Sequence, residues 1–332
     1  MTKIDIFSGF LGAGKTTLIK KLIEEAYHGE KIVLIENEFG EIGIDGGFLA
    51  EAGIQINEMN SGCICCSLVG DFAEALKKVI SEYVPDRILI EPSGVGKLSD
   101  VINAVKNADT EGAELNGFTT VVDANKCKMH MKNFGEFFND QIENAGCIVL
   151  SHTGKMSEEK IADCVAHIKE HNSAAVIVST PWEELTGAQL LEAMERKSTL
   201  EAEISELTEE AHEHHHHHDH DEECHCHENE HHHHHHHADE VFVSFGAETT
   251  KKFNADALKA ALDGFTDTEK YGTVLRAKGI VAGDDGKWIH FDYIPGESDV
   301  RFGGASIIGR LCVIGSKLDK DAISEALGVT LA

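Results

Sequence analysis

Before residue 198, short apolar segments alternate with longer stretches in which apolar residues recur at helical spacing. The apolar segments predict strands at Ile4–Ser8, Ile32–Glu36, Ile54–Asn57, Arg87–Glu91, Thr119–Asp123, Cys147–Ser151 and Ala175–Ser179. The longer stretches predict helices at Thr17–Glu25, Gly70–Tyr83, Leu98–Ala108, Phe134–Ala145, Glu158–Glu170 and Gly187–Met194. This βα repetition predicts an α/β domain with a mostly parallel sheet, flanking helices, and ligands at the carboxyl ends of the strands.

The pattern changes in the last part of the chain. It predicts strands at Glu240–Phe245, Val274–Val281, Lys287–Ile294 and Gly309–Ile314, and helices at Asp256–Leu262 and Lys320–Leu327. The Gly-Asp-Asp-Gly sequence at 283–286 predicts a hairpin turn, which favours an antiparallel sheet. We therefore expect a first domain over residues 1–197, a connecting loop over 198–239, and a small α+β domain over 240–332.

The connecting loop is rich in metal-binding residue types between Glu209 and Asp239. It has almost no aliphatic residues, so it cannot bury a core, and we expect a solvated loop. Imidazole and thiolate groups suit Zn²⁺, Ni²⁺, Co²⁺ and Cu²⁺. The candidate ligands are His214, His216, His218, Cys224, Cys226, His231, His233 and His235. A purification tag at 231–237, or a charged linker without metal function, is the alternative interpretation.

Composition narrows the range of partners. The 332-residue chain carries a formal charge of −29, and residues 198–250 contain no Lys or Arg. This acidity argues against a nucleic-acid partner and favours cations. The chain begins without a basic and apolar leader and has no apolar run of membrane-spanning length, so we expect no membrane partner and a cytoplasmic location. In a reducing compartment, its nine cysteines are expected to serve as metal ligands rather than disulfides.

The first predicted strand runs into Gly-Phe-Leu-Gly-Ala-Gly-Lys-Thr-Thr at 9–17, a full match to the phosphate-binding P-loop. In such a loop the backbone N–H groups point at phosphates, a lysine contacts the outer phosphate oxygens, and a hydroxyl enters the Mg²⁺ shell. An ordinary glycine-rich turn is the alternative. The candidate nucleotide-binding residues are Gly12, Ala13, Gly14, Lys15, Thr16 and Thr17.

Two further carboxylate motifs follow predicted strands. Glu36-Asn-Glu-Phe-Gly-Glu41 follows the second strand and is a candidate switch loop. Glu91-Pro-Ser-Gly94 follows a buried apolar strand, where Glu91 is placed to organise Mg²⁺ or its waters and Gly94 to contact the γ-phosphate. Strand ends capped by solvated carboxylates are the alternative to both.

Three cysteines lie within four residues at Cys63, Cys65 and Cys66. They are too close together to complete a tetrahedral site without strain, so we expect two or three of them to bind Zn²⁺ together with Glu36 or Glu41. Inert cysteines packed as small apolar side chains are the alternative.

Together, GFLGAGKTT, ENEFGE, GCICC, EPSG, the histidine-rich insertion and LRAKG at 275–279 resemble the CobW-type metallochaperone GTPases, relatives of UreG and HypB. The resemblance implies a GTPase that binds a transition metal beside its switch loops and delivers it to a client protein. It implies a phosphate cradle at 12–17, a Mg²⁺ site at Thr16 and Glu91, and an internal metal site formed by Glu36, Glu41, Cys63, Cys65 and Cys66. Lys15, Thr16 and Glu91 are then the candidate catalytic residues.

Members of that family that are specific for guanine read the base with an Asn-Lys-x-Asp sequence after a late strand. The corresponding place here reads Ser151-His152-Thr153-Gly154, which contains no carboxylate. Ser151 and His152 are therefore candidate nucleotide-binding residues, with GTP as the first choice and ATP as the alternative. The function expected is slow NTP hydrolysis coupled to delivery of Zn²⁺, or of Co²⁺ or Ni²⁺, to a client protein, with a homodimer possible in this family. The rival functions are a metal store with a vestigial nucleotide site and a small-metabolite kinase.

Overall fold

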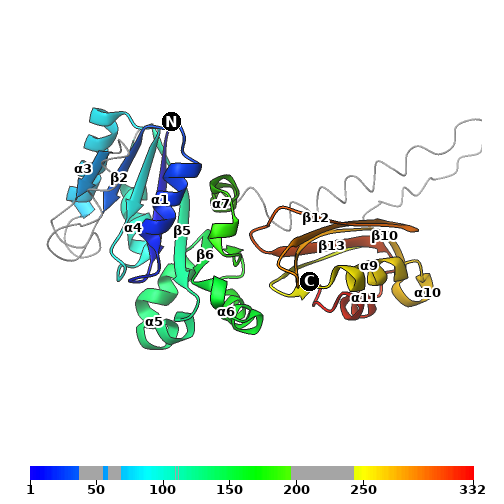
Figure 1. Ribbon diagram of the computed structural model, residues 1–332. Coiled ribbons are helices and arrows are strands. Elements are labelled where there is room, and N and C mark those ends of the chain that lie inside the picture. The colour runs from blue at the N-terminus through cyan, green and yellow to red at the C-terminus, as the bar shows by residue number, and fades with distance from the viewer. Residues whose placement is uncertain (37–54, 59–68, 109, 111, 196–242) are drawn as a thin grey trace, which may run out of the picture. The chain divides into compact units, whose positions relative to one another are not determined.

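The computed structural model describes residues 1–36, 55–58, 69–108, 110, 112–195 and 243–332. The chain divides into two compact units, residues 1–197 and 198–332 (Figure 1). Each unit has its own sheet and its own buried core, and each is described separately.

The described part of the first unit contains a seven-stranded sheet in the order β3-β2-β4-β1-β5-β6-β7. Every neighbouring pair in it is parallel, which confirms the predicted α/β class. The strands are β1 (Thr2–Gly9), β2 (Ile32–Glu36), β3 (Gln55–Glu58), β4 (Arg87–Glu91), β5 (Ala113–Asp123), β6 (Cys147–Ser151) and β7 (Val176–Val178). Because these strands run parallel, their carboxyl ends share one edge of the sheet, where loops can meet around a ligand.

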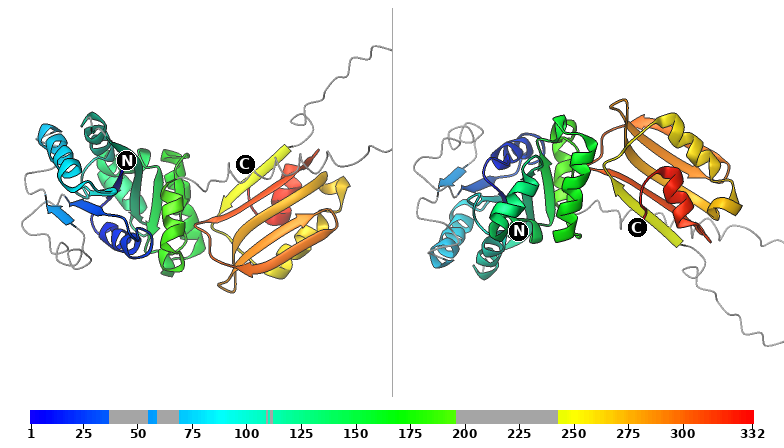
Figure 2. Two further views of the ribbon diagram at one scale, coloured as in Figure 1. Left: turned by 90° about the horizontal axis from the view of Figure 1, so that it is seen from above. Right: turned by 90° about the horizontal axis from the view of Figure 1, so that it is seen from below.

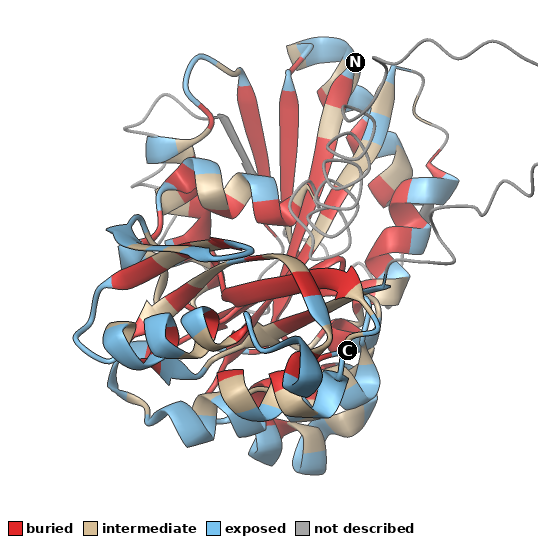
Figure 3. Cartoon of the chain, turned by 90° about the vertical axis from the view of Figure 1, so that its right-hand side faces the viewer, coloured by how far each residue is buried: buried red, intermediate tan, exposed pale blue. Residues whose placement is uncertain are grey.

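Helices cover both faces of this sheet (Figure 2). On one face α1 (Lys15–Glu25) contacts α7 (Gly187–Met194). The other helices form a series of neighbours, α3 (Val69–Tyr83), α4 (Leu98–Asn107), α5 (Cys127–Glu143) and α6 (Glu158–His171). Two short 3-10 helices, η1 (Thr153–Lys155) and η2 (Trp182–Glu184), follow β6 and β7. Because both faces are covered, β2, β4 and β6 are apolar except at their ends and lie buried (Figure 3).

A buried arginine joins several charged groups near the amino ends of the strands. Arg87, at the first position of β4, is only 2% exposed and forms an ion pair with Asp5 of β1. Its guanidinium also contacts Glu30 at 2.6 Å and Glu195 at 3.7 Å, and lies 4.4 Å from the ring centre of Tyr27. Burial alone would lower the pKa of Arg87, but its hydrogen bonds to Glu30 and the charge of Asp5 raise it above the usual value. This cluster holds the strands together at the end opposite the P-loop.

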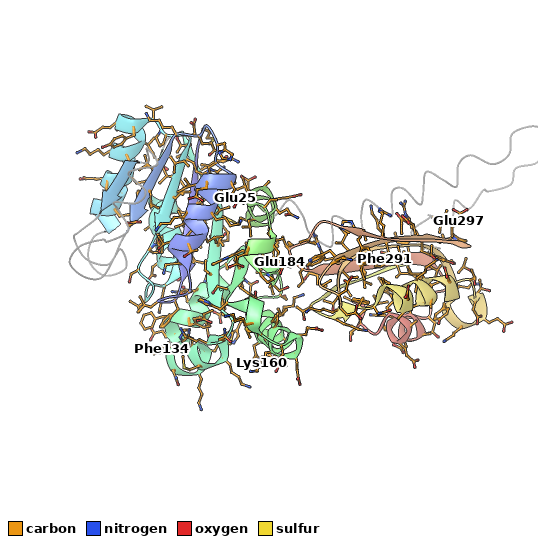
Figure 4. All side chains as sticks on the ribbon, in the orientation of Figure 1. Glu25, Phe134, Lys160, Glu184, Phe291 and Glu297 are labelled. Atoms are coloured by element: carbon orange, nitrogen blue, oxygen red, sulfur yellow. The ribbon has the colours of Figure 1, made fainter. Side chains whose placement is uncertain are left out.

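Among residues 243–332, the second unit contains a six-stranded sheet with the path β12-β11-β10-β13-β8, and β9 pairs with β10. The pairs along the path are antiparallel, as the hairpin turn at 283–286 predicted. The strands are β8 (Val243–Thr249), β9 (Lys252–Phe253), β10 (Thr273–Gly283), β11 (Trp288–Ile294), β12 (Glu297–Gly303) and β13 (Gly309–Ser316). The helices of this described part lie on one face (Figure 1), namely α9 (Ala255–Gly264), α10 (Thr268–Tyr271) and α11 (Lys320–Leu327). Phe291, labelled in Figure 4, is part of the core of this unit. The predicted α+β class is confirmed.

The bounds of several predicted elements differ from those in the structure, and β9, α10 and β12 were not predicted. Helix α5 begins at Cys127 rather than at the predicted Phe134, and Phe134 has non-helical backbone angles, φ −134° and ψ 29°, that interrupt the helix. β5 begins at Ala113, well before the predicted Thr119. Its first half was not predicted because that half is polar and only partly buried. β12 was missed because it is largely exposed and carries charged side chains. Residues 240–242 of the predicted strand Glu240–Phe245 lie outside the described residues.

Candidate nucleotide site

The loop between β1 and α1 has the backbone that a P-loop requires. Gly9, Gly12 and Gly14 have φ values of 142°, 71° and 100°, a region that side chains disfavour. A Cβ atom at Gly9 would lie 2.4 Å from the carbonyl oxygen of Val121, so glycine is also required there by space. Gly14 immediately precedes α1, and the helix begins at Lys15. The candidate residues 12–17 therefore lie around the amino end of a helix, with Ala13 buried and Thr17 exposed.

The structure brings Lys15, Thr16 and Glu91 together. Thr16 Oγ1 lies 3.2 Å from Glu91 Oε1 and 3.3 Å from Oε2, as its hydroxyl donates to the carboxylate. Lys15 Nζ lies 3.0 Å from the carbonyl oxygen of Gly9 and 3.8 Å from Glu91 Oε1. A hydroxyl and a carboxylate in contact are suitable oxygen ligands for Mg²⁺, and the lysine, only 8% exposed, is a cation fixed beside them. The donor set therefore fits a magnesium-bound phosphate chain.

Two more candidate residues lie near this cluster. Glu36 is the register partner of Glu91 in the parallel pair of β2 and β4, and it is 8% exposed. Gly94 is buried, and a Cβ atom there would lie 2.9 Å from the backbone nitrogen of Leu11. The loop after β4 therefore packs directly on the P-loop, which is the placement that contact with a γ-phosphate requires.

Gln141 of α5 holds the loop after β4 in position, a role that no sequence pattern indicated. Its side-chain amide donates to the carbonyl oxygens of Gly94, at 3.2 Å, and Gly96, at 2.7 Å. Gln141 is completely buried. The sequence shows only a polar residue within a predicted helix, and this does not indicate which carbonyl groups its side chain binds.

The last residue of β6, Ser151, and the residues that follow it lie at the same edge of the sheet. The Ser151 hydroxyl donates to the carbonyl oxygen of Val122 at 3.3 Å. His152 is exposed with φ 59°, and its carbonyl oxygen accepts from the Asn125 side chain at 3.3 Å. Thr153 is 3% exposed, and its hydroxyl has no hydrogen-bond partner among the described residues.

Aromatic residues of α5 pack against the P-loop. Phe10, within the loop, packs on His130 of α5 with ring centres 4.6 Å apart, and on Phe138 at 6.0 Å. It also contacts Phe134, which is 45% exposed and is labelled in Figure 4. Burial lowers the pKa of His130 below its usual value, and the charge of Lys126 lowers it further. We therefore treat His130 as a neutral packing residue.

Most of the predicted metal ligands lie outside the described residues. These are Glu41, Cys63, Cys65, Cys66, His214, His216, His218, Cys224, Cys226, His231, His233 and His235. Of the proposed internal site, only Glu36 is described. Within the described ranges, no three His, Cys, Asp or Glu side chains are grouped so that they could hold a metal ion. Both metal sites remain predictions.

Fold and sequence together define a P-loop nucleotide-binding protein. Residues 3–179 match the profile of the CobW/HypB/UreG nucleotide-binding domain, and residues 242–331 match that of the cobalamin synthesis protein cobW C-terminal domain. The chain belongs to the CobW/HypB/UreG family. None of the helices in the described part of the chain is long and apolar enough to cross a membrane.

Several curated proteins are similar to this chain. Zinc chaperone YeiR of Escherichia coli K12 is 32% identical over 160 residues, covering 48% of this chain and 49% of that protein. Zinc chaperone CobW of Sinorhizobium sp is 34% identical over 177 residues, 45% of this chain and 50% of that protein. The zinc-regulated GTPase metalloprotein activator 1 of Schizosaccharomyces pombe is 28% identical over 191 residues, which cover 55% of this chain and 46% of that protein.

The chain thus spans about half the length of the curated relatives it matches. Among solved structures, Zn(II)-bound YjiA GTPase from E. coli is 18% identical and covers 98% of both chains, with a TM-score of 0.42.

Proposed function

We propose that this protein is a nucleotide-dependent metallochaperone: it binds and slowly hydrolyses GTP, with ATP as the alternative, and delivers a transition metal to a client protein. Zn²⁺ is the first candidate, and Co²⁺ and Ni²⁺ are the alternatives. The observation that carries the proposal is the contact of Lys15 and Thr16 with Glu91 at the P-loop. The names of the curated relatives, zinc chaperones and zinc-regulated GTPase activators, support the metal and the nucleotide.

In this proposal the chain's own groups hold the phosphates and their cation. Backbone N–H groups of 12–17 and the Lys15 ammonium bind the phosphate chain, and Gly94 contacts the terminal phosphate. Thr16 and Glu91 hold Mg²⁺, which supplies charge neutralisation of the transferring phosphoryl group. No arginine lies among the residues that form the described part of this site, so we expect slow intrinsic turnover.

The same geometry suggests how nucleotide and metal are coupled. Glu36 is a register neighbour of Glu91, and it begins the predicted switch loop that leads toward Glu41. A change in the surroundings of Glu91 on hydrolysis therefore reaches a proposed metal ligand through one strand pair. Coupling must be reciprocal: if the nucleotide changes metal affinity, the metal changes nucleotide affinity by the same factor.

We further propose that residues 1–197 bind the nucleotide, that residues 198–239 collect metal loosely, and that residues 240–332 dock the client. The acidic loop would raise the local concentration of cations without choosing among them. A cytoplasmic location and a homodimer belong to the same proposal.

The test combines hydrolysis with metal binding on the full chain. Glu91→Gln and Thr16→Ala are expected to reduce Mg²⁺-dependent hydrolysis by about a hundredfold or more. Lys21→Ala is the control, because Lys21 lies on the same helix and pairs with Glu25 at 2.7 Å, away from the site. Equal hydrolysis by Glu91→Gln and the unaltered protein would refute the assigned site.

The metal arm of the test measures Zn²⁺ affinity with and without a non-hydrolysable GTP analogue, and again after Cys65→Ala. Identical affinities in the presence and absence of nucleotide would refute the coupling. If the protein binds Zn²⁺ but hydrolyses no nucleotide, the result would favour a metal-storage function. Transfer of phosphate to a metabolite would favour the small-metabolite kinase.

A further inference from the structure

We propose that Trp182 provides the aromatic face on which the purine base of the bound nucleotide stacks. The inference rests on the proposed nucleotide site and adds a base-positioning residue to it. Its basis is the position of Trp182 beside the P-loop, on the side of β1 away from Glu91.

The orientation of the nucleotide follows from the sheet order. Thr16 contacts Glu91, which ends β4, so the magnesium ion and the outer phosphates belong on the β4 side of the P-loop. β4 and β5 lie on opposite sides of β1, and β6 and β7 continue beyond β5. The phosphate chain must leave the magnesium end toward the other side, so the nucleoside is directed to the loops that follow β5, β6 and β7.

Trp182 lies in this region, in contact with the P-loop itself. A Cβ atom built at Gly14 would lie 3.0 Å from Cη2 and 3.5 Å from Cζ2 of the indole, so the ring edge rests on the backbone just before Lys15. The residue is only partly buried. An indole at a phosphate loop with accessible ring surface can stack on a base, and every base presents a π face.

The segment that carries Trp182 is firmly anchored. Ser179 and Thr180, which precede it, are 7% and 6% exposed, and Leu185, which follows it, is 2% exposed. The next helix, α7, is attached to α1 because the backbone nitrogen of Gly187 donates to Glu25 Oε2 at 2.8 Å. Figure 4 labels Glu25 where α1 faces α7. The indole is therefore held at a fixed place relative to the helix that begins at the P-loop, which reduces the entropy lost on stacking.

A second, independent feature indicates a ligand at this edge. The hydroxyl of Thr153 is buried yet has no partner in the described part of the chain. Thr153 follows β6, the direct neighbour of β7, so its segment and that of Trp182 come from adjacent strand ends. Buried hydroxyls are almost always hydrogen-bonded, and the polar edge of a purine offers both donors and acceptors. A stacking ring and a hydroxyl are suited to a purine, and neither carries the charge that distinguishes guanine strongly from adenine.

The sequence supplies a direct test, because the chain contains two tryptophans. Trp288 lies in β11 of the second unit, so Trp288→Phe leaves Trp182 as the single tryptophan reporter. Its fluorescence is measured while Mg²⁺ with GTP, ATP or inorganic tripolyphosphate is added. Both nucleotides are expected to quench Trp182, whereas tripolyphosphate, which has no base, is expected to bind with little change.

Affinities measured by calorimetry complete the experiment. Trp182→Ala is expected to weaken GTP and ATP binding about tenfold or more, Trp182→Phe to retain most of the affinity, and both to bind tripolyphosphate like the unaltered protein. Unchanged tripolyphosphate binding shows that the P-loop of the variant is intact. If Trp182→Ala does not fold, the single-tryptophan titration decides alone.

GTP binding with no quenching, or with the same affinity after Trp182→Ala, would overturn the role of Trp182 while leaving the proposed function in place. A failure of the unaltered protein to bind any nucleotide would overturn both.

Discussion

Replacing Arg87 with Met should severely destabilise the first unit. The side chain is 2% exposed, and its removal leaves the Asp5 carboxylate, 3% exposed, without a cation. Asp5 would then keep only the Asn116 amide, at 2.7 Å, among the hydrogen-bond partners found for it. Removing one partner of a buried ion pair costs about 3 to 5 kcal/mol, because an uncompensated charge stays buried. The total free energy of unfolding of a domain is about 5 to 15 kcal/mol, so the loss expected for Arg87→Met is a large fraction of the stability of the first unit.

The assay is urea unfolding followed by the fluorescence of Trp182 in the Trp288→Phe background, so that only the first unit is observed. Lys78→Met is the matched control, since Lys78 pairs with Glu82 at 3.9 Å while both side chains are more than half exposed, at 70% and 53%. Such an exposed pair contributes about 0 to 1 kcal/mol. Adding Asp5→Asn to Arg87→Met should recover part of the loss, because the remaining partner is then neutral. If Arg87→Met costs no more than Lys78→Met, the reasoning is wrong.

The remaining predictions concern the P-loop, pH and the histidine-rich segment. Gly9→Ala should destabilise the first unit far more than Gly12→Ala in the same urea assay, because a Cβ atom meets Val121 at the first position and nothing within 4 Å at the second. The pKa of His130 is lowered from 6.5 in the folded protein, so on acidification the unfolded chain binds a proton at this residue at a higher pH than the folded chain does. The free energy of unfolding should therefore fall as the pH drops through about 6.5, and His130→Phe should remove that part of the pH dependence in unfolding curves. Deleting residues 209–239 should lower the Zn²⁺ stoichiometry in metal analysis yet leave NTP hydrolysis nearly unchanged, and loss of nucleotide binding would contradict a separate metal collector.

Local sequence was sufficient to predict the phosphate loop and most strands. The apolar strands β2, β4 and β6 have the predicted bounds, because burial on both faces leaves an unbroken apolar run. The glycines of the P-loop are required by backbone angles that few other residues adopt, so the motif itself specifies the conformation. The placement of Glu91 beside Thr16 followed from a general rule about parallel strand ends.

Contacts between distant parts of the chain could not be predicted in this way. Neither Gln141 nor Arg87 belongs to a motif, and the partners of both depend on how helices and strands far apart in sequence come together. The helix is interrupted at Phe134, directly before Gly135, and the contact of Phe134 with Phe10 joins two segments that are far apart in sequence. The roles assigned to the sulfur and imidazole ligands remain predictions, because those residues lie outside the described part of the chain.

β12 lies at one end of the strand path in the second unit, and its composition bears on solubility. Glu297, labelled in Figure 4, Asp299 and Arg301 are exposed and alternate along the strand with Ser298 and Val300. An unpaired strand edge invites the corresponding edge of another molecule, and charged side chains placed along it oppose such pairing. Replacing these charged residues with neutral ones is therefore expected to promote pairing of β12 between molecules, and so aggregation.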